Sequence, residues 1–154
     1  MTYLGLGSNL GDKEGNIKKA LALISERAGG ILALSSFYET EPWGYSSSER
    51  YLNTAVGVET KLSPEELLHT TQEIERETGR KTKTVDGKYG DRLIDIDILL
   101  YDDLIIQTPA LIIPHPLMCQ RAFVLQPLSE IAPKVIHPVF GKTIAELFFH
   151  INEL

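Results

Sequence analysis

The fold of this chain is decided by one segment, Arg92-Leu93-Ile94-Asp95-Ile96-Asp97-Ile98-Leu99-Leu100. Apolar residues alternate with others and the branched isoleucine recurs, so the segment predicts a β-strand. Side chains of a strand point alternately to its two faces. The isoleucines therefore face one side, whereas Asp95 and Asp97 face the other with Cα atoms about 6–7 Å apart.

Two carboxylates on one strand face can bind a cation. Like charges this close repel each other unless a positive charge lies between them. Mg²⁺ prefers carboxylate oxygens together with the phosphate oxygens of a substrate, so Asp95 and Asp97 are candidate magnesium ligands. A solvated strand face explains the same spacing, and the spacing alone does not separate the two interpretations.

Outward from this strand, the hydrophobic pattern predicts alternating strands and helices. Ser63 and Glu66 form a capping box around Pro64, which marks a helix start. The segment 104–106 is expected to pair back as a hairpin strand, and the prolines at 114, 116 and 127 are expected to break the tail into short pieces. The expected strands are 2–7, 31–38, 51–59 and 92–100, and the expected helices are 12–28, 63–79, one within 121–131, and 143–150.

This order is β-α-β-β-α-β followed by a C-terminal extension. It predicts an α+β fold with a ferredoxin-like core, in which two helices pack on one face of an antiparallel sheet. The 154 residues fit one domain, 1–154, with a sizeable core.

A glycine-rich segment, Gly5-Leu6-Gly7-Ser8-Asn9-Leu10-Gly11-Asp12, ends the first strand. It resembles a loop that cradles phosphate, but it lacks the Lys-Ser/Thr ending of a P-loop. A tight turn from strand to helix is the alternative.

The bulk composition is that of an ordinary globular protein, 43% hydrophobic and 23% charged. A net charge of −6 argues against broad binding of nucleic acid. No apolar run approaches the roughly 20 residues of a membrane span, and no signal peptide is evident. Cys119 is the only cysteine, so no intrachain disulfide can form. We therefore expect a cytoplasmic monomer without nucleic-acid or membrane partners.

Cationic residues precede and follow the acidic strand in the sequence, and several aromatic residues lie beside polar ones. Mg²⁺ and arginine together stabilise charge on a transferring phosphoryl group, and aromatic rings can stack on a flat ligand whose edge an asparagine reads. A solvated lysine loop and ordinary core positions for Tyr51 and Phe123 are the alternatives. The residues alone thus indicate Mg²⁺-dependent phosphoryl-type transfer with a flat substrate. The cations are Arg80, Lys81, Lys83, Lys88, Arg92, His115 and Arg121, and the aromatics are Trp43, Tyr45, Tyr51, Tyr89 and Phe123, with Asn53 beside them.

With these residues assembled, the chain closely resembles the 6-hydroxymethyl-7,8-dihydropterin pyrophosphokinase family of folate biosynthesis. The matching segments span nearly the whole chain, in order and spacing. They are Leu6-Gly7-Ser8-Asn9-Leu10-Gly11, Ser35-Ser36-Phe37-Tyr38-Glu39-Thr40-Glu41-Pro42, Tyr51-Leu52-Asn53, Arg92 through Asp97, Pro114-His115-Pro116 and Arg121-Ala122-Phe123.

The resemblance implies transfer of the pyrophosphoryl group of ATP to the hydroxymethyl group of the dihydropterin, with release of AMP. It implies two Mg²⁺ ions on Asp95 and Asp97, and closing lids at 43–50 and 80–92. The implied catalytic residues are Arg92, Asp95, Asp97 and Arg121. The implied ATP-binding residues are Gln72, Glu75, Arg80, Arg92, His115 and Arg121. The implied pterin-binding residues are Thr40, Pro42, Trp43, Tyr51, Asn53, Tyr89 and Phe123.

Two other functions stay open beside this one. A metal-dependent nucleotide phosphodiesterase would use the same aspartates to activate water, and would hydrolyse nucleotide without a pterin. A non-catalytic module that binds pterin or nucleotide is the other alternative, because a ferredoxin-like fold does not determine function.

Overall fold

The computed structural model describes residues 1–40, 50–78 and 93–152. In chain order its elements are β1 (Thr2–Ser8), α1 (Lys13–Arg27), β2 (Gly29–Leu34), β3 (Tyr38–Thr40), β4 (Tyr51–Thr60), α2 (Pro64–Thr78), β5 (Asp95–Tyr101), β6 (Ile106–Gln107), β7 (Ile112–Ile113), the 3-10 helix η2 (Met118–Gln120), α3 (Ala122–Ile131) and α4 (Ile144–Asn152).

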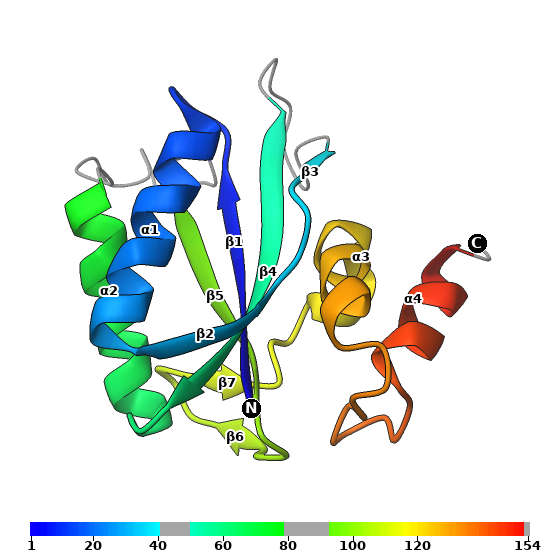
Figure 1. The fold of residues 1–154 in the computed structure, drawn as a ribbon. Helices are drawn as coiled ribbons and strands as arrows, with labels where there is room; N and C mark the ends of the chain where they lie inside the picture. Colours follow the sequence, from blue (N-terminus) through cyan, green and yellow to red (C-terminus); the bar gives the residue numbers. More distant parts are fainter. Residues whose placement is uncertain (41–49, 79–92, 153–154) are drawn as a thin grey trace.

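The main sheet is antiparallel and has five strands in the order β2-β4-β1-β5, with β3 also pairing to β4. Helices α1 and α2 cover one face of this sheet, whereas α3 and α4 lie on the other side (Figure 1). The ferredoxin-like core is therefore confirmed. The C-terminal extension adds the second helical layer.

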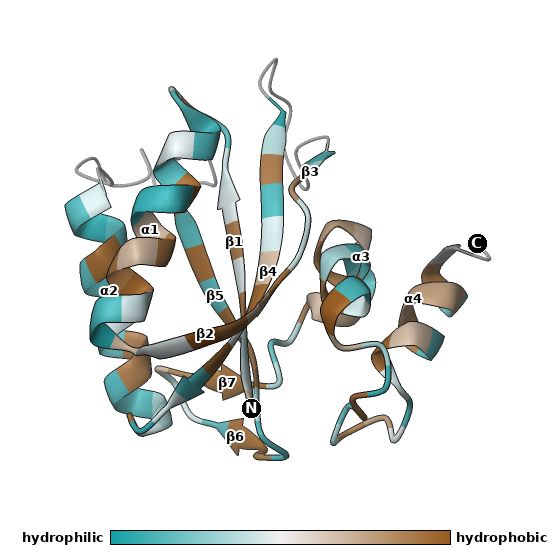
Figure 2. Ribbon diagram, viewed as in Figure 1, coloured by the Kyte–Doolittle hydropathy of each residue, from teal (hydrophilic) through white to brown (hydrophobic). Residues whose placement is uncertain are grey.

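The two faces of β5 differ as the alternation predicts. Ile94, Ile96 and Ile98 are buried in the core between the sheet and helices α1 and α2. Asp95 and Asp97 are only partly buried and point to the face on which α3 packs. The hydropathy colouring shows hydrophilic and hydrophobic residues alternating along β5 (Figure 2).

Side-chain caps start the helices where the sequence predicts. The backbone N–H of Gly15 donates to the Asp12 carboxylate at 3.1 Å, at the start of α1. Ser63 and Glu66 exchange hydrogen bonds of 2.9 and 3.2 Å, which confirms the capping box of α2. Gly11 has a positive φ of 65°, so this end of the glycine-rich segment is the tight turn between β1 and α1.

The strand expected over 31–38 is instead two strands, β2 and β3. The interruption falls at Ser35, whose hydroxyl accepts the backbone N–H of Ala55 at 2.9 Å and lies 2.8 Å from the Thr54 hydroxyl. A side chain thus takes a bond that a regular ladder would give to the backbone. The chain turns away from β4 here and returns to it at Tyr38.

Two expectations for the tail are wrong. The segment 104–106 does not pair back on β5, because β6 pairs with β7 instead. The turn between β6 and β7 is closed by hydrogen bonds of 3.0 and 3.1 Å between Thr108 and Leu111. Pro127 does not break the chain into pieces, since α3 continues through it. A proline there removes only the helical bond to the carbonyl of Phe123. Within the described ranges, no helix is long and apolar enough to span a membrane.

Candidate active site

The floor of the site is the face of β1 that carries Gly5 and Gly7, two positions without a side chain. Gly5 pairs with Asp97, and Gly7 pairs with Asp95 on one side and with Asn53 on the other. Directly opposite residues of neighbouring strands point to the same face, so the aspartates and Asn53 flank a glycine-lined trough. A Cβ atom at Gly7 would lie only 2.9 Å from the Asn53 side-chain oxygen. The glycines therefore keep the space between the two polar groups open.

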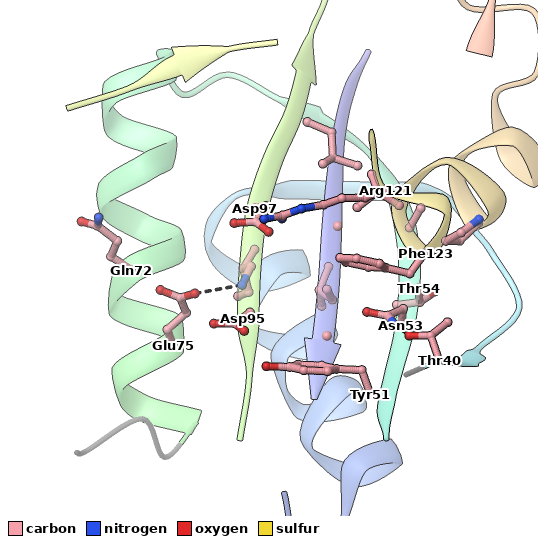
Figure 3. Close-up of a pocket in the computed structure, with 18 of the residues that line it drawn as sticks. Thr40, Tyr51, Asn53, Thr54, Gln72, Glu75, Asp95, Asp97, Arg121 and Phe123 are labelled. Atoms are coloured by element: carbon pink, nitrogen blue, oxygen red, sulfur yellow. Dashed lines mark hydrogen bonds between the residues drawn. The ribbon is translucent and has the colours of Figure 1, made fainter. Parts of the chain in front are cut away.

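A cavity of about 290 Å³ lies above this floor, between α2, α3 and the sheet. Figure 3 shows acidic side chains at one end of it, aromatic rings over its middle, and polar groups of β3 and β4 at the other end. Nine of the residues predicted for the site line this one cavity: Thr40, Tyr51, Asn53, Gln72, Glu75, Asp95, Asp97, Arg121 and Phe123.

A second, adjoining cavity of about 260 Å³ is lined by one more of the predicted site residues, His115. Asp97 and Leu68 line both cavities, so the two spaces meet beside the second aspartate. The other walls of the second cavity come from β5 and from the β6–β7 hairpin. An elongated ligand can therefore extend from one cavity to the other past Asp97.

Glu75 holds the aspartate strand in place. β5 is an edge strand, and the Ile96 backbone N–H, between the two aspartates, donates to the Glu75 carboxylate at 2.8 Å. Glu75 is only 8% exposed, so this bond is shielded from water. A buried carboxylate is stable when it accepts such bonds. The bond fixes the backbone from which Asp95 and Asp97 project.

The donor set at the acidic end suits magnesium. Within residues 1–40, 50–78 and 93–152, no three His, Cys, Asp or Glu side chains gather into a metal site. The protein thus offers the pair Asp95 and Asp97, both facing the cavity. Mg²⁺ is commonly held by one or two carboxylates, with water and substrate phosphates completing its octahedron. The residues fit a metal that arrives with a phosphate-bearing substrate.

His115 is a neutral imidazole that faces Asp97. Its Nδ1 accepts the backbone N–H of Leu117 at 3.2 Å, so the proton lies on Nε2, which is 3.9 Å from the Asp97 carboxylate. Its own backbone N–H donates to the Leu99 carbonyl at 3.0 Å and so attaches the segment to β5. Burial, and secondly the charge of Arg121, lowers the pKa of His115 to about 4.

We predict that this depressed pKa makes stability dependent on pH. The unfolded chain takes up the proton near the ordinary pKa of 6.5, whereas folded His115 takes it up only near pH 4. The free energy of unfolding should therefore fall between these values as the pH drops, by up to about 3 kcal/mol for this group. NMR titration of the imidazole measures the pKa directly. Because burial also lowers the pKa of His137, the stability change is compared with that of His115→Asn.

Arg121 and Phe123 enter the cavity from the start of α3. Arg121 is the N-cap residue of this helix and is 6% exposed. Its guanidinium lies 5.5 Å from the centre of the Phe123 ring and extends across β1 toward Asp97 (Figure 3). The positive end of the α3 dipole lies at the same place, so this corner favours an anion.

Away from the aspartates, the cavity forms a flat slot between two aromatic rings, and polar side chains close one end of this slot. The rings of Phe123 and Tyr51 project over β1 from α3 and β4 (Figure 3). At the end of the slot the Asn53 amide donates to the Thr40 hydroxyl at 2.6 Å. An amide and a hydroxyl held in this way can donate to and accept from the edge of a heteroaromatic ring.

Five of the predicted site residues lie outside the described residues: Pro42, Trp43, Arg80, Tyr89 and Arg92. Most of the two predicted lids, 43–50 and 80–92, lies there as well. Conversely, sequence reasoning missed the role of Gly5 as cavity floor and the bond from Ile96 to Glu75. The signal for the floor was present, because glycines two residues apart in a strand share one face.

Comparison with known proteins identifies the family of this chain. Residues 3–133 match the family described as 7,8-dihydro-6-hydroxymethylpterin-pyrophosphokinase (HPPK). A 2-amino-4-hydroxy-6-hydroxymethyldihydropteridine pyrophosphokinase from Porphyromonas gingivalis is 50% identical over 139 residues, which cover 90% of this chain and 94% of the relative. The enzyme of that name from Aquifex aeolicus is 44% identical over 144 residues, 94% of this chain and 88% of the relative.

Solved structures share the fold. Plasmodium falciparum HPPK-DHPS, crystallised with pteroate, superposes with a TM-score of 0.79 at 19% identity, over 97% of this chain and 42% of that chain. Another HPPK-DHPS, in complex with substrates, gives 0.77 at 18% identity, over 99% and 43% of the two chains. This chain thus spans about two fifths of those longer proteins, and at such identity they support the fold alone. The match over residues 3–133 and the two closely similar relatives together establish that the chain belongs to the HPPK family.

Proposed function

We propose that this pyrophosphokinase of folate synthesis binds a pterin and ATP at opposite ends of the cavity above β1. In the reaction it would transfer the pyrophosphoryl group of ATP to the hydroxymethyl group of 6-hydroxymethyl-7,8-dihydropterin and release AMP. The observation that supports this most is the arrangement across one sheet face. Asp95 and Asp97 flank the glycine floor on one side, and Asn53 flanks it on the other.

The pterin would occupy the slot between Tyr51 and Phe123. Stacking on two rings suits a flat bicycle. The Asn53 amide and the Thr40 hydroxyl, already bonded to each other, would read its polar edge. The hydroxymethyl group would then point along the trough toward the aspartates. Pro42, Trp43 and Tyr89 are further pterin contacts that we propose from the sequence alone.

ATP would extend through the second cavity with its phosphates at Asp97. Arg121 extends toward this aspartate (Figure 3), His115 lies 3.9 Å from it, and both would offer N–H donors to phosphate oxygens. Gln72 and Glu75 line the first cavity, which Asp97 also lines, and would contact the nucleotide there. Arg80 and Arg92 are proposed from the sequence alone to hold phosphates as well. Asp95 and Asp97 would hold the two magnesium ions, which when bound supply positive charge to the phosphate oxygens.

The protein's task in this reaction is positioning and charge stabilisation. Phosphoryl-type transfer passes through a loose transition state that requires no protein nucleophile. Arg121 is positioned to stabilise charge that develops on the transferred group. The Glu75 bond would keep the aspartates in place, and the slot would present the acceptor hydroxyl to the phosphates. We further propose, from the sequence alone, that residues 1–154 act as one domain and that the protein is a cytoplasmic monomer.

The proposed reaction is tested by its products. The purified chain is incubated with ATP and Mg²⁺, with and without the dihydropterin, and nucleotides are resolved by chromatography. AMP should appear only with the pterin, one per pyrophosphorylated product. ADP would indicate transfer of a single phosphoryl group, and AMP without the pterin would indicate a phosphodiesterase. Tight pterin binding without any turnover would indicate a binding module.

We predict that Phe123→Ala weakens pterin binding much more than it weakens nucleotide binding. Loss of one stacking ring should raise the Kd for the pterin about tenfold. The affinity for an ATP analogue should stay within about twofold, since Phe123 does not line the second cavity. Calorimetry measures both constants. Phe149→Ala, which removes a ring that is 63% exposed on α4, is the matched control. Equal losses of pterin and nucleotide affinity would contradict the slot assignment.

A further inference from the structure

One carboxylate outside the cavity ties its two walls together. Glu130, near the end of α3, accepts the backbone N–H of Ser36 at 3.0 and 3.2 Å and the Ser36 hydroxyl at 3.2 Å. It also accepts the hydroxyl of Tyr38, the first residue of β3. We infer that Glu130 is a positioning residue for the pterin, which sets the separation between α3 and β3 across the slot.

The segment that Glu130 holds is also anchored to β4 through Ser35 and to the core through the partly buried Phe37. Ser35 is buried and bonded to the Thr54 hydroxyl and to the Ala55 backbone of β4. At Ser36 and Phe37 the chain has left the ladder of β4, and it rejoins the ladder at Tyr38. From α3, Glu130 binds Ser36 at the start of this excursion and Tyr38 where the chain rejoins β4.

β3 needs such a second attachment because it is short. It has three residues and is paired only to β4 within the described sheet. Its last residue, Thr40, accepts the Asn53 amide in the slot, two positions beyond Tyr38. A short edge strand held by few backbone bonds moves readily. A shift of Tyr38 would therefore displace the hydroxyl that orients Asn53.

The other wall is carried by the helix that bears Glu130. Phe123 lies seven residues earlier on α3, about 10 Å along its axis. Helix α3 packs on β4 and touches β3, so its C-terminal end is fixed where Glu130 bonds to the excursion. The same helix then holds Phe123 over the slot. The Glu130 contacts therefore couple the stacking ring to the polar end of the slot.

The hydrogen bonds make Glu130 a charged acceptor. The bond from the Tyr38 hydroxyl, followed by those from Ser36, lowers the pKa of Glu130, and the same bond raises the pKa of Tyr38. Bonds to a charged acceptor are stronger than neutral ones. Glu130 is exposed, however, so the contacts serve to orient the walls more than to stabilise the fold.

The test compares two glutamates with similar bonding. Glu130→Ala removes the carboxylate between α3 and β3, whereas Glu130→Gln keeps an oxygen acceptor without the charge. Glu146→Ala is the matched control, because Glu146 also accepts a backbone N–H and a hydroxyl, both of Thr143, at α4 and away from the cavity. Tyr38→Phe removes only one of the bonds to Glu130.

Calorimetry measures the Kd for the pterin in the presence of α,β-methylene ATP, and the Kd for this nucleotide alone. Glu130→Ala should raise the pterin Kd about fivefold to tenfold and leave the nucleotide Kd within twofold. Glu130→Gln and Tyr38→Phe should give smaller increases, and Tyr38→Phe should add little to Glu130→Ala because both remove the same bond. Glu146→Ala should change neither Kd.

This inference rests on the proposed pterin slot, and Phe123→Ala separates the two. An unchanged pterin Kd in Glu130→Ala, while Phe123→Ala weakens binding, would overturn the positioning role and leave the slot intact. No effect of either variant would overturn both. A parallel loss of nucleotide affinity, or the same loss in Glu146→Ala, would show a general loss of structure and would also overturn the role of Glu130.

Discussion

Asp97→Ala is expected to reduce kcat by about a thousandfold or more, since loss of a metal ligand removes several kcal/mol of charge stabilisation. Asp97 lines both cavities and faces His115, so it stands where phosphates and pterin would meet. The fold should survive, because the side chain lies on the cavity face of β5 and not among the buried isoleucines. Steady-state AMP release measures the change in rate.

Two further measurements tie this loss to the metal. Binding of Mn²⁺ with α,β-methylene ATP, followed by electron paramagnetic resonance, should weaken in Asp97→Ala. The free energy of unfolding in urea should change by less than about 1 kcal/mol. Asp103→Ala, which removes an exposed carboxylate just beyond the end of β5, is the matched control and should retain the parental rate. A variant at Asp97 with parental turnover would refute the metal assignment.

The parts of the fold that follow local rules could be predicted from the sequence. The period of two in β5 separates the aspartates from the isoleucines, and the structure has them on opposite faces. Capping boxes start α2 and α4: Ser63 bonds reciprocally with Glu66, and Thr143 bonds reciprocally with Glu146. Each pair is three residues apart in the chain, so the sequence alone can show it. From such elements the β-α-β-β-α-β order leads to the ferredoxin-like sheet.

The parts that depend on partners distant in sequence could not be predicted. Ser35 ends β2 because its hydroxyl bonds to the Ala55 backbone, and that neighbour is known only once β4 is in place. Glu75 looks like any helical glutamate until β5 brings Ile96 beside it. The residues that line the cavity could be predicted through the family resemblance. Their contacts, such as that of Asn53 with Thr40, depend on strand register.

Arg121→Ala is expected to impair the chemical step far more than it impairs pterin binding. A buried donor aimed at developing charge contributes about a hundredfold to a thousandfold to kcat. The Arg121 guanidinium also lies against the Phe123 ring, a contact worth about 1 kcal/mol, so the pterin Kd should rise less than about tenfold. Single-turnover measurements at saturating ATP and pterin isolate the chemical step.

A conservative variant separates charge from geometry at this position. Arg121→Lys keeps a positive charge but not the planar fork that binds phosphate through two N–H groups, so it should recover only part of kcat. Arg76→Ala removes an exposed arginine of α2 that does not line the cavity, and should act like the parent. If Arg121→Ala lowered pterin affinity alone and kept its rate at saturation, Arg121 would belong to the pterin slot. Its neighbour Asp97 would then depend on other cations for the phosphate charge.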